Sequence, residues 1–251
     1  MESSGEISSL SDFVEKLEAG AIANGEPPIW FRGCSKSTYE LVPSIFRPPL
    51  EGANETLMLR RFMQDAYALL SVPPRDRWEW LFLAQHHGVP TRLLDWTENP
   101  LVGLYFASEL VAEDADDVES DGAVWLLNPT ALNGHSLRDN RLDIPMFEVD
   151  DVLEQYHPLH ATSMTVHIPP AAGLAVRSFL RLSAQWGTFT IHTRNEALGE
   201  APQEPPILKK YIVPGNAKDS ILRQLDSVGI QARTVYPDLS HLGASVKERY
   251  S

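Results

Sequence analysis

The densest group of residues that could perform chemistry lies between positions 85 and 107. Its central part reads Q-H-H-G-V-P-T-R-L-L-D-W-T, and apolar segments with helical periodicity flank it on both sides. Polar side chains in such a place lose free energy on burial unless they pair with one another or with a ligand. The stretch therefore predicts a functional site or a hydrogen-bonded structural hub.

Two interpretations of the centre of this stretch stay open at the sequence level. In the first, Arg92 and Asp95 form an ion pair that holds a turn between two helices. In the second, the connection lines a pocket, with Arg92, Asp95 and Thr97 in its wall and His86 and His87 at its mouth. The two interpretations are compatible, and neither is favoured by spacing alone.

Two other motifs place polar residues at the ends of expected strands. In Phe31-Arg32-Gly33, an arginine could bind a phosphate or carboxylate at two points, and the glycine would let a ligand approach the backbone. The alternative is that Arg32 pairs with an acid on a helix. Gln185, with Gly187 close behind, could present an amide to a ligand or bond to backbone. Cys34 could act as a nucleophile only with a histidine beside it, which the sequence does not show.

Several common cofactor patterns are absent from the sequence. The adjacent pair His86-His87 would point about 100° apart on a helix, so one ion could not be chelated as by residues four apart. No H-E-x-x-H pattern or cysteine cluster accompanies the pair, and we expect no metal. Neither a P-loop nor a G-x-G-x-x-G dinucleotide fingerprint occurs.

Composition is that of an ordinary globular protein, with 251 residues, 43% hydrophobic and 22% charged. The single cysteine excludes an intramolecular disulfide and fits a reducing compartment. The sequence has no apolar leader and no run near eighteen apolar residues. We therefore expect a cytoplasmic protein that does not enter a membrane.

The net charge of −13 disfavours general nucleic-acid binding. The charge is uneven, because residues 31–97 carry eight Lys/Arg and seven Asp/Glu whereas the remainder carries 13 and 27. Six acids fall within residues 113–121, which we expect to form an exposed loop. A central region containing arginines could hold a small phosphate ligand, but long duplex DNA is a poor match.

Periodicity and capping residues predict an α+β protein with one domain, in which a helix-rich N-terminal half packs on a mixed β-sheet core. The expected helices are 10–17, 55–70, 76–87, 99–108 and 218–228. The expected strands are 29–33, 123–127, 165–168, 187–193, 208–213 and 232–236. The segment 133–160 shows no clear period.

The motifs together resemble the FRG domain family, named for the tripeptide Phe31-Arg32-Gly33. The resemblance covers residues 9–250, and the run Q-H-H-G-V-P-T-R-L-L-D-W-T is its most specific part. Its other matching segments are L-V-P-S-I-F-R at 41–47, N-P at 99–100, Y-F-A at 105–107, A-Q-W-G-T-F at 184–189 and Y-P-D-L at 236–239.

The order of the motifs is also similar to that of ADP-ribosyltransferases, in which an arginine holds NAD, a middle motif shapes the nicotinamide pocket and a late acid stabilises the cation formed. This resemblance implies an ADP-ribosyltransferase-like fold and NAD as the cofactor and small-molecule substrate. It assigns catalytic roles to Arg32, Asp95, Gln185 and His86. The residues that it implies in nucleotide binding are Arg32, Gly33, Ser44, Arg47, Arg92, Trp96 and Thr97.

One departure from the transferase pattern keeps other functions open. Gln185 is neutral where transferases usually have a glutamate, so it can position a ribose hydroxyl but cannot offset a cation. We therefore expect an ADP-ribosyltransferase or NAD glycohydrolase whose protein or nucleic-acid acceptor is unknown, and a bacterial defence or toxin effector is the biological role that this activity suggests. The alternatives are a non-catalytic nucleotide sensor and a metal-dependent hydrolase.

Overall fold

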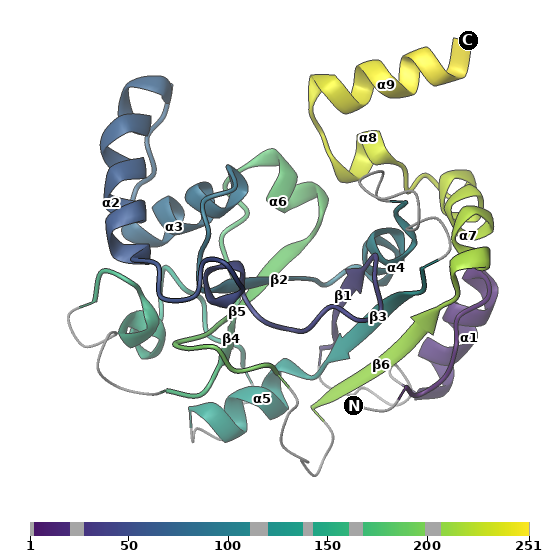
Figure 1. Cartoon of the computed structure of the whole chain (residues 1–251), viewed down its shortest axis with the longest axis horizontal. Coiled ribbons are helices and arrows are strands. Elements are labelled where there is room, and N and C mark those ends of the chain that lie inside the picture. Colours follow the sequence, from purple (N-terminus) through teal and green to yellow (C-terminus); the bar gives the residue numbers. More distant parts are fainter. Residues whose placement is uncertain are drawn as a thin grey trace.

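The structure is a computed structural model that describes residues 3–20, 28–110, 120–137, 143–160, 168–198 and 207–250. Within them, six strands form one sheet in the order β4-β5-β2-β1-β3-β6 (Figure 1). The strands are β1 (Trp30–Cys34), β2 (Leu93–Thr97), β3 (Gly122–Leu127), β4 (Ala171–Gly173), β5 (Gly187–Ile191) and β6 (Leu208–Val213). All five pairings between these strands are antiparallel.

The helices surround this sheet. The α-helices are α1 (Leu10–Gly20), α2 (Glu55–Ala66), α3 (Arg77–His86), α4 (Pro100–Ser108), α5 (Pro129–Ser136), α6 (Leu180–Ala184), α7 (Gly215–Ser227), α8 (Ala232–Val235) and α9 (Leu239–Tyr250). Short 3-10 helices are η1 (Ser44–Phe46), η2 (Tyr67–Leu69) and η4 (Asp151–Tyr156). No helix among the described residues is long and apolar enough to cross a membrane.

The two faces of the sheet carry different parts of the core. Phe31 of β1 is in register with Thr97 of β2, and side chains two residues apart on a strand share a face. On that face, one apolar cluster packs against α1, α4 and α7 and a second packs against α2 and α3. The opposite face, which carries Trp30, Leu94 and Trp125, packs against α5.

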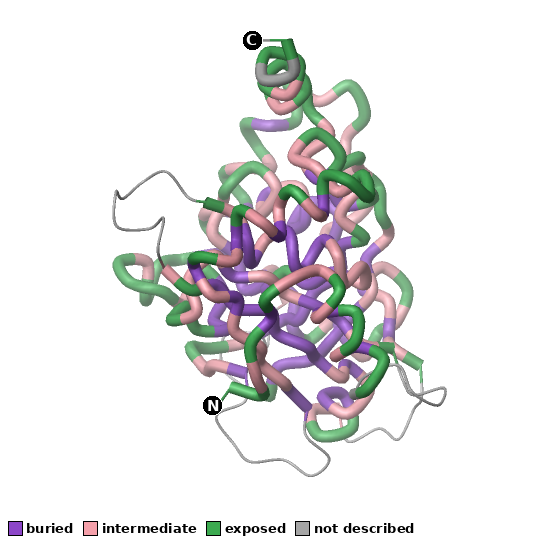
Figure 2. Tube along the Cα trace, turned by 90° about the vertical axis from the view of Figure 1, so that its right-hand side faces the viewer, coloured by how far each residue is buried: buried purple, intermediate pink, exposed green. Residues whose placement is uncertain are grey.

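The described residues therefore form one mixed α/β domain around a shared sheet. Buried residues fill its centre, whereas α9 is exposed along most of its length and extends away from the rest (Figure 2). In Figure 1, α2 and α9 project on the same side of the sheet, with α3, α6 and α8 between them.

Four of the expected helices, α1 to α4, begin within one residue of the predicted position, and local side chains cap three of them. Asn54, Asp76 and Asn99 each accept hydrogen bonds from backbone N–H groups at the first turns of α2, α3 and α4. Gly88 and Gly229, just beyond α3 and α7, have the positive φ angles that a C-terminal cap favours.

Four expectations about the elements are wrong. The connection between α3 and α4 is not a simple turn, because it contains the central strand β2. The segment 232–236 is helical rather than extended, since Gln231 and Thr234 form a reciprocal capping box that starts α8. The sheet is antiparallel rather than mixed, and helices and strands alternate along the chain instead of separating into halves. Of the expected strand 165–168, only Ile168 is described, and residues 113–119 of the expected acidic loop lie outside the described residues.

Candidate ligand-binding pocket

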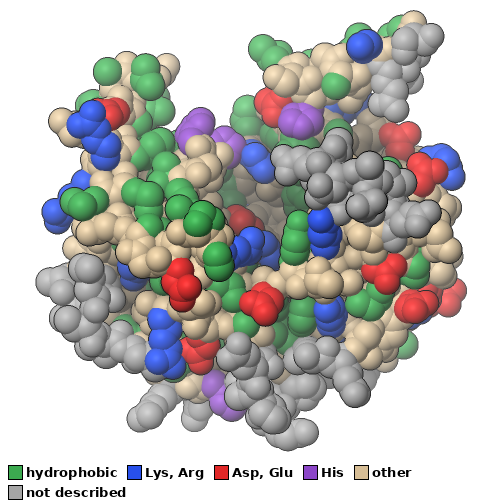
Figure 3. All heavy atoms as spheres, in the orientation of Figure 1, with side chains coloured by type: hydrophobic (Ala, Val, Ile, Leu, Met, Phe, Trp, Pro, Cys, Tyr) green, Lys and Arg blue, Asp and Glu red, His purple; other side chains and the backbone are tan. Residues whose placement is uncertain are grey.

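A pocket of about 370 Å³ lies at the centre of the sheet, and its lining includes residues of all three apolar clusters. Figure 3 shows the surface hollowed between α2 on one side and α8 and α9 on the other, with basic and histidine side chains around the hollow. Its lining comprises Phe31, Arg32, Gly33, Cys34, Ser35, Tyr39, Arg47, Phe82, Gln85, His86, Asp95, Trp96, Thr97, Phe106, Glu109, Phe179, Arg181, Leu182, Gln185 and Phe189.

The pocket sits where the two central strands separate. Strand β1 shares five register pairs with β3 but only Phe31↔Thr97 with β2. Beyond that pair, Nη1 of Arg32 donates a 2.6 Å hydrogen bond to the backbone carbonyl oxygen of Asp95. This side-chain hydrogen bond takes the place of the next backbone hydrogen bond between β1 and β2, and the guanidinium lies in the gap between the two strands.

Arg32 keeps donors for a ligand. Its side chain is 19% exposed, and its Nη1 lies 3.8 Å from Oδ2 of Asp95. Its buried Nε has no hydrogen-bond partner among the described residues. Because a guanidinium carries five N–H donors, Arg32 can bind an anion without releasing Asp95.

A second guanidinium lies close to the first. Arg47 also lines the pocket, and its Nε donates a 2.7 Å hydrogen bond to the carbonyl oxygen of Val42. Burial lowers the pKa of Arg47, and repulsion from Arg32 lowers it further, while Asp95 opposes the shift. Two guanidinium groups close enough to repel each other would be stabilised by a shared phosphate.

Asp95 is oriented by a residue that the sequence interpretation overlooked. Its side chain is 63% exposed on the pocket side, and Oδ1 accepts a 2.6 Å hydrogen bond from Nε2 of Gln85. Gln85 is itself held through its Oε1, which accepts from the hydroxyl of Thr91. The carboxylate therefore has a fixed position while remaining accessible to a ligand.

His86 lies at the pocket and His87 does not line it. The His86 ring is 5.0 Å from the ring of Phe179 and 4.8 Å from that of His87. Burial, and then the charges of His87 and Arg181, lower the pKa of His86 below its usual value. His86 is therefore neutral at pH 7 and able to accept a proton or hydrogen bond.

Gln185 lines the pocket, but its side-chain amide is hydrogen-bonded to the backbone of a neighbouring helix. Its Nε2 donates a 3.2 Å hydrogen bond to the carbonyl oxygen of Val235 in α8, and its backbone carbonyl oxygen accepts a 2.5 Å hydrogen bond from Thr97 Oγ1. Trp96 is buried, with its indole N–H bonded to Thr190 Oγ1 at 3.1 Å. All three predicted residues, Gln185, Thr97 and Trp96, are thus at the site, each with a clear packing role.

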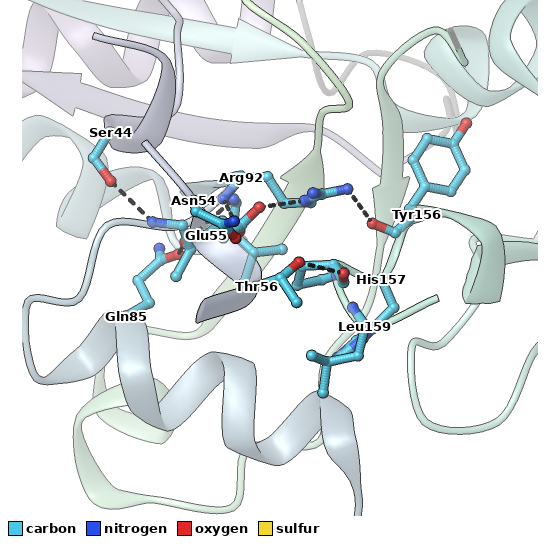
Figure 4. Close-up of polar contacts among 12 residues, drawn as sticks. Ser44, Asn54, Glu55, Thr56, Gln85, Arg92, Tyr156, His157 and Leu159 are labelled. Atoms are coloured by element: carbon cyan, nitrogen blue, oxygen red, sulfur yellow. Dashed lines mark hydrogen bonds and ion pairs between the residues drawn. The ribbon is translucent and has the colours of Figure 1, made fainter. Parts of the chain in front are cut away.

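Two predicted binding residues, Arg92 and Ser44, lie outside the pocket lining. Arg92 is buried and donates from Nε and its backbone N–H to the two carboxylate oxygens of Glu55, at 2.6 and 2.8 Å (Figure 4). Its Nη1 donates to the carbonyl of Tyr156 at 2.9 Å. Ser44 Oγ accepts a 3.3 Å hydrogen bond from the backbone N–H of Thr91. The predicted Arg92–Asp95 ion pair is wrong, because Arg92 points to the opposite face of β2 from Asp95.

The structural role of Gly33 also differs from the one expected from the sequence. A Cβ atom at this position would lie 2.1 Å from the carbonyl oxygen of Gly103 and 2.4 Å from the backbone nitrogen of Ala107. The glycine is therefore required for α4 to pack directly on β1, whereas the sequence interpretation assigned it to ligand approach. Close packing of α4 in turn brings Phe106 and Glu109 to the pocket.

A second polar cluster, missed from the sequence, lies at the α4 side of the pocket. Glu109 follows α4, and both of its carboxylate oxygens accept hydrogen bonds from the hydroxyl of Tyr236, at 2.9 and 3.0 Å. The guanidinium of Arg181 lies 4.9 Å from the centre of the Tyr236 ring. The only sequence signal for this cluster is Tyr236 in the Y-P-D-L motif.

The fold and the site together define a mixed α/β domain with an arginine-lined pocket at a break in its sheet. Residues 27–116 match the model of the FRG domain, as the motifs predict. Extension of the domain to residues 9–250 stays a prediction. No curated protein and no solved structure matches the chain. In the described residues, no group of three His, Cys, Asp or Glu side chains is placed to hold a metal ion.

Proposed function

We propose that the pocket binds NAD and transfers its ADP-ribose to a protein or nucleic-acid acceptor, or to water. The observation that carries this proposal is the convergence of three motifs. Arg32 on β1, Asp95 and Thr97 on β2, and Gln185 just before β5 come from adjacent strands and line one pocket. The same order of motifs underlies the resemblance to ADP-ribosyltransferases, and an ADP-ribosyltransferase-like fold belongs to the same proposal.

The charges of the pocket suit a dinucleotide. Arg32 and Arg47 provide two neighbouring guanidinium groups for the diphosphate. Aromatic side chains, including Phe106, Phe179 and Phe189, line the walls and could contact the planar base or nicotinamide. The volume of about 370 Å³ falls in the range of small-molecule sites.

The chemistry of nicotinamide departure fits the acidic group beside these arginines. Breaking the bond between C1′ and the nicotinamide nitrogen leaves a ribose with oxocarbenium character. The carboxylate of Asp95, held by Gln85, can stabilise that positive charge electrostatically. A neutral His86 can accept a hydrogen bond from an acceptor that enters at the mouth and so polarise it.

Nicotinamide release from NAD tests this function, together with NAD binding measured by calorimetry. The wild-type protein is assayed alone and with mixed protein, RNA and single-stranded DNA acceptors. We expect saturable binding and release, both reduced at least about tenfold by Arg32→Ala, since a charge-assisted hydrogen bond contributes about 1.5–3 kcal/mol. Glu18→Gln, a neutralisation on the exposed surface of α1, serves as the control. Turnover that is indifferent to Arg32→Ala would contradict the site assignment.

A non-catalytic nucleotide-binding module is the second candidate. It is favoured by Gln185, whose neutral amide is bonded to the α8 backbone and so offers no charge to a cation. Saturable NAD binding without any product over long incubation would support it. A role as a bacterial defence or toxin effector in the cytoplasm stays a proposal under the catalytic reading.

A further inference from the structure

The pocket contains a second carboxyl group besides Asp95. Glu109 lies at the C-terminal end of α4, on the same pocket lining as Arg32, and was not among the residues predicted from sequence. Tyr236, which follows α8, donates to both oxygens of Glu109. The lining of the pocket thus contains one acid on the sheet, Asp95, and another at the C-terminal end of α4, Glu109.

We propose that Glu109 is a catalytic residue that accepts the proton of a hydroxyl or amine nucleophile when ADP-ribose is transferred. This proposal rests on the proposed function and deepens it, because it names the chemical class of acceptor. An acceptor that is already an anion, such as a carboxylate side chain, needs no such base. The acceptor site is then the part of the pocket between Asp95 and Glu109.

The step balances without any further reactant. The oxygen or nitrogen of the acceptor forms a bond to C1′ of the ribose, and the bond from C1′ to the nicotinamide nitrogen breaks. The electron pair of that bond leaves with nicotinamide, which becomes neutral. The proton of the acceptor passes to the Glu109 carboxylate and then to solvent at the pocket mouth.

The surroundings of Glu109 suit a proton acceptor. Burial raises the pKa of its carboxyl, while hydrogen bonds from Tyr236 and Tyr105 and the charges of Arg181 and His241 act in the opposite direction. Burial and the neighbouring carboxylate also raise the pKa of both tyrosines, so the tyrosines stay protonated and can only donate to Glu109. A carboxylate with a raised pKa is a stronger base than a free one.

Gln185 explains how the acid is kept in place. Its Nε2 bonds to the α8 backbone at Val235, the residue before Tyr236. Its backbone carbonyl oxygen accepts a hydrogen bond from the hydroxyl of Thr97 on β2. Gln185 is therefore a positioning residue: it connects the sheet to α8 and hence to the Tyr236 hydroxyl that holds Glu109.

Four proteins test the proposal: the wild type, Glu109→Gln, Tyr236→Phe and Glu109→Asp, with Glu18→Gln as the control. NAD binding, nicotinamide release across pH 5 to 9 and thermal unfolding are measured for each. We expect Glu109→Gln to bind NAD within about twofold of the wild type but to release nicotinamide at least about 100-fold more slowly, as for loss of a general base. Glu109→Asp, which retains a carboxylate, should recover part of the rate.

The pH profile separates catalysis from a structural role. The wild-type rate should fall at low pH as Glu109 becomes protonated. Tyr236→Phe removes a donor that lowers the pKa of Glu109, so this fall should move to higher pH. A purely structural contact would lower the unfolding temperature without moving the profile, and that result overturns the proposal. The Tyr236→Phe profile decides the question if Glu109→Gln does not fold.

The remaining outcomes distinguish failure of the Glu109 proposal from failure of the proposed NAD function. If Arg32→Ala abolishes release while Glu109→Gln keeps the wild-type rate and profile, the Glu109 proposal is wrong and the NAD function stands. If the folded wild type neither binds nor cleaves NAD, the proposed function is wrong and the role of Glu109 is refuted with it.

Discussion

Replacing Arg92 should lower the stability of the protein but leave the pocket intact. The sequence interpretation, which placed Arg92 in nucleotide binding, would instead have binding lost and stability kept. Side-chain exposure is only 8% for Arg92 and 6% for Glu55. Arg92→Met would leave the Glu55 carboxyl buried and without its guanidinium partner on Oε2, although Oε1 would still accept from the backbone N–H of residue 92. Breaking a buried ion pair in this way costs about 3–5 kcal/mol. That is a large part of a typical unfolding free energy of about 5–15 kcal/mol.

Urea unfolding at pH 7 measures this cost, and two matched variants define its origin. The double variant Glu55→Leu with Arg92→Met removes both charges, so most of the lost stability should return. Arg32→Met removes an arginine that bonds to a backbone carbonyl at the pocket, so it should cost about 1 kcal/mol and abolish anion binding. The reasoning is refuted if Arg92→Met keeps wild-type stability while losing NAD binding.

Three other substitutions or conditions test the packing around the site. Gly33→Ala should destabilise the fold by about 3 kcal/mol in thermal unfolding, because its Cβ would overlap the Gly103 carbonyl; wild-type stability would contradict the close packing. His157 and His192 have a pKa lowered by burial to about 3, below the value of 6.5 expected when unfolded. Only the unfolded chain takes up their protons at mild acidity, so urea unfolding should show stability falling by about 1 kcal/mol per histidine between pH 7 and pH 5.5. Gln185→Ala should cost about 1 kcal/mol and weaken hydrogen-exchange protection of α8, and unchanged protection would exclude its positioning role.

The elements predicted correctly are those whose ends are determined by neighbouring residues. Asn54, Asp76 and Asn99 cap helices with their own side chains, and Gly88 ends α3 in a conformation that glycine adopts readily. The strand β2 was missed because its five residues form a strand through pairing with Phe189 and other residues of β5, almost a hundred positions away. Pairing of this kind leaves no local pattern.

The residues of the pocket differ in the same way: some belong to local sequence motifs, and others depend on contacts with residues far along the chain. Arg32 and Asp95 could be predicted because each belongs to a compact motif. The roles of Arg92 and Asp95 could not be separated, because the assignment of a face requires knowing that the segment is a strand, in which residues three apart point to opposite sides. Glu109 carries no motif of its own, and it becomes a site residue only through Tyr236, which lies 127 residues further along the chain.

The lining of the pocket comes from two parts of the chain. The segment that matches the FRG domain, residues 27–116, contributes Arg32, Asp95 and Glu109. The residues of α6 and β5, and Gln185 between them, lie outside that segment and contribute Arg181, Leu182 and Phe189 to the lining. Under the proposed function, the groups that would act on a phosphate or ribose lie within the matched segment. The acceptor would then also contact residues outside that segment, such as Arg181.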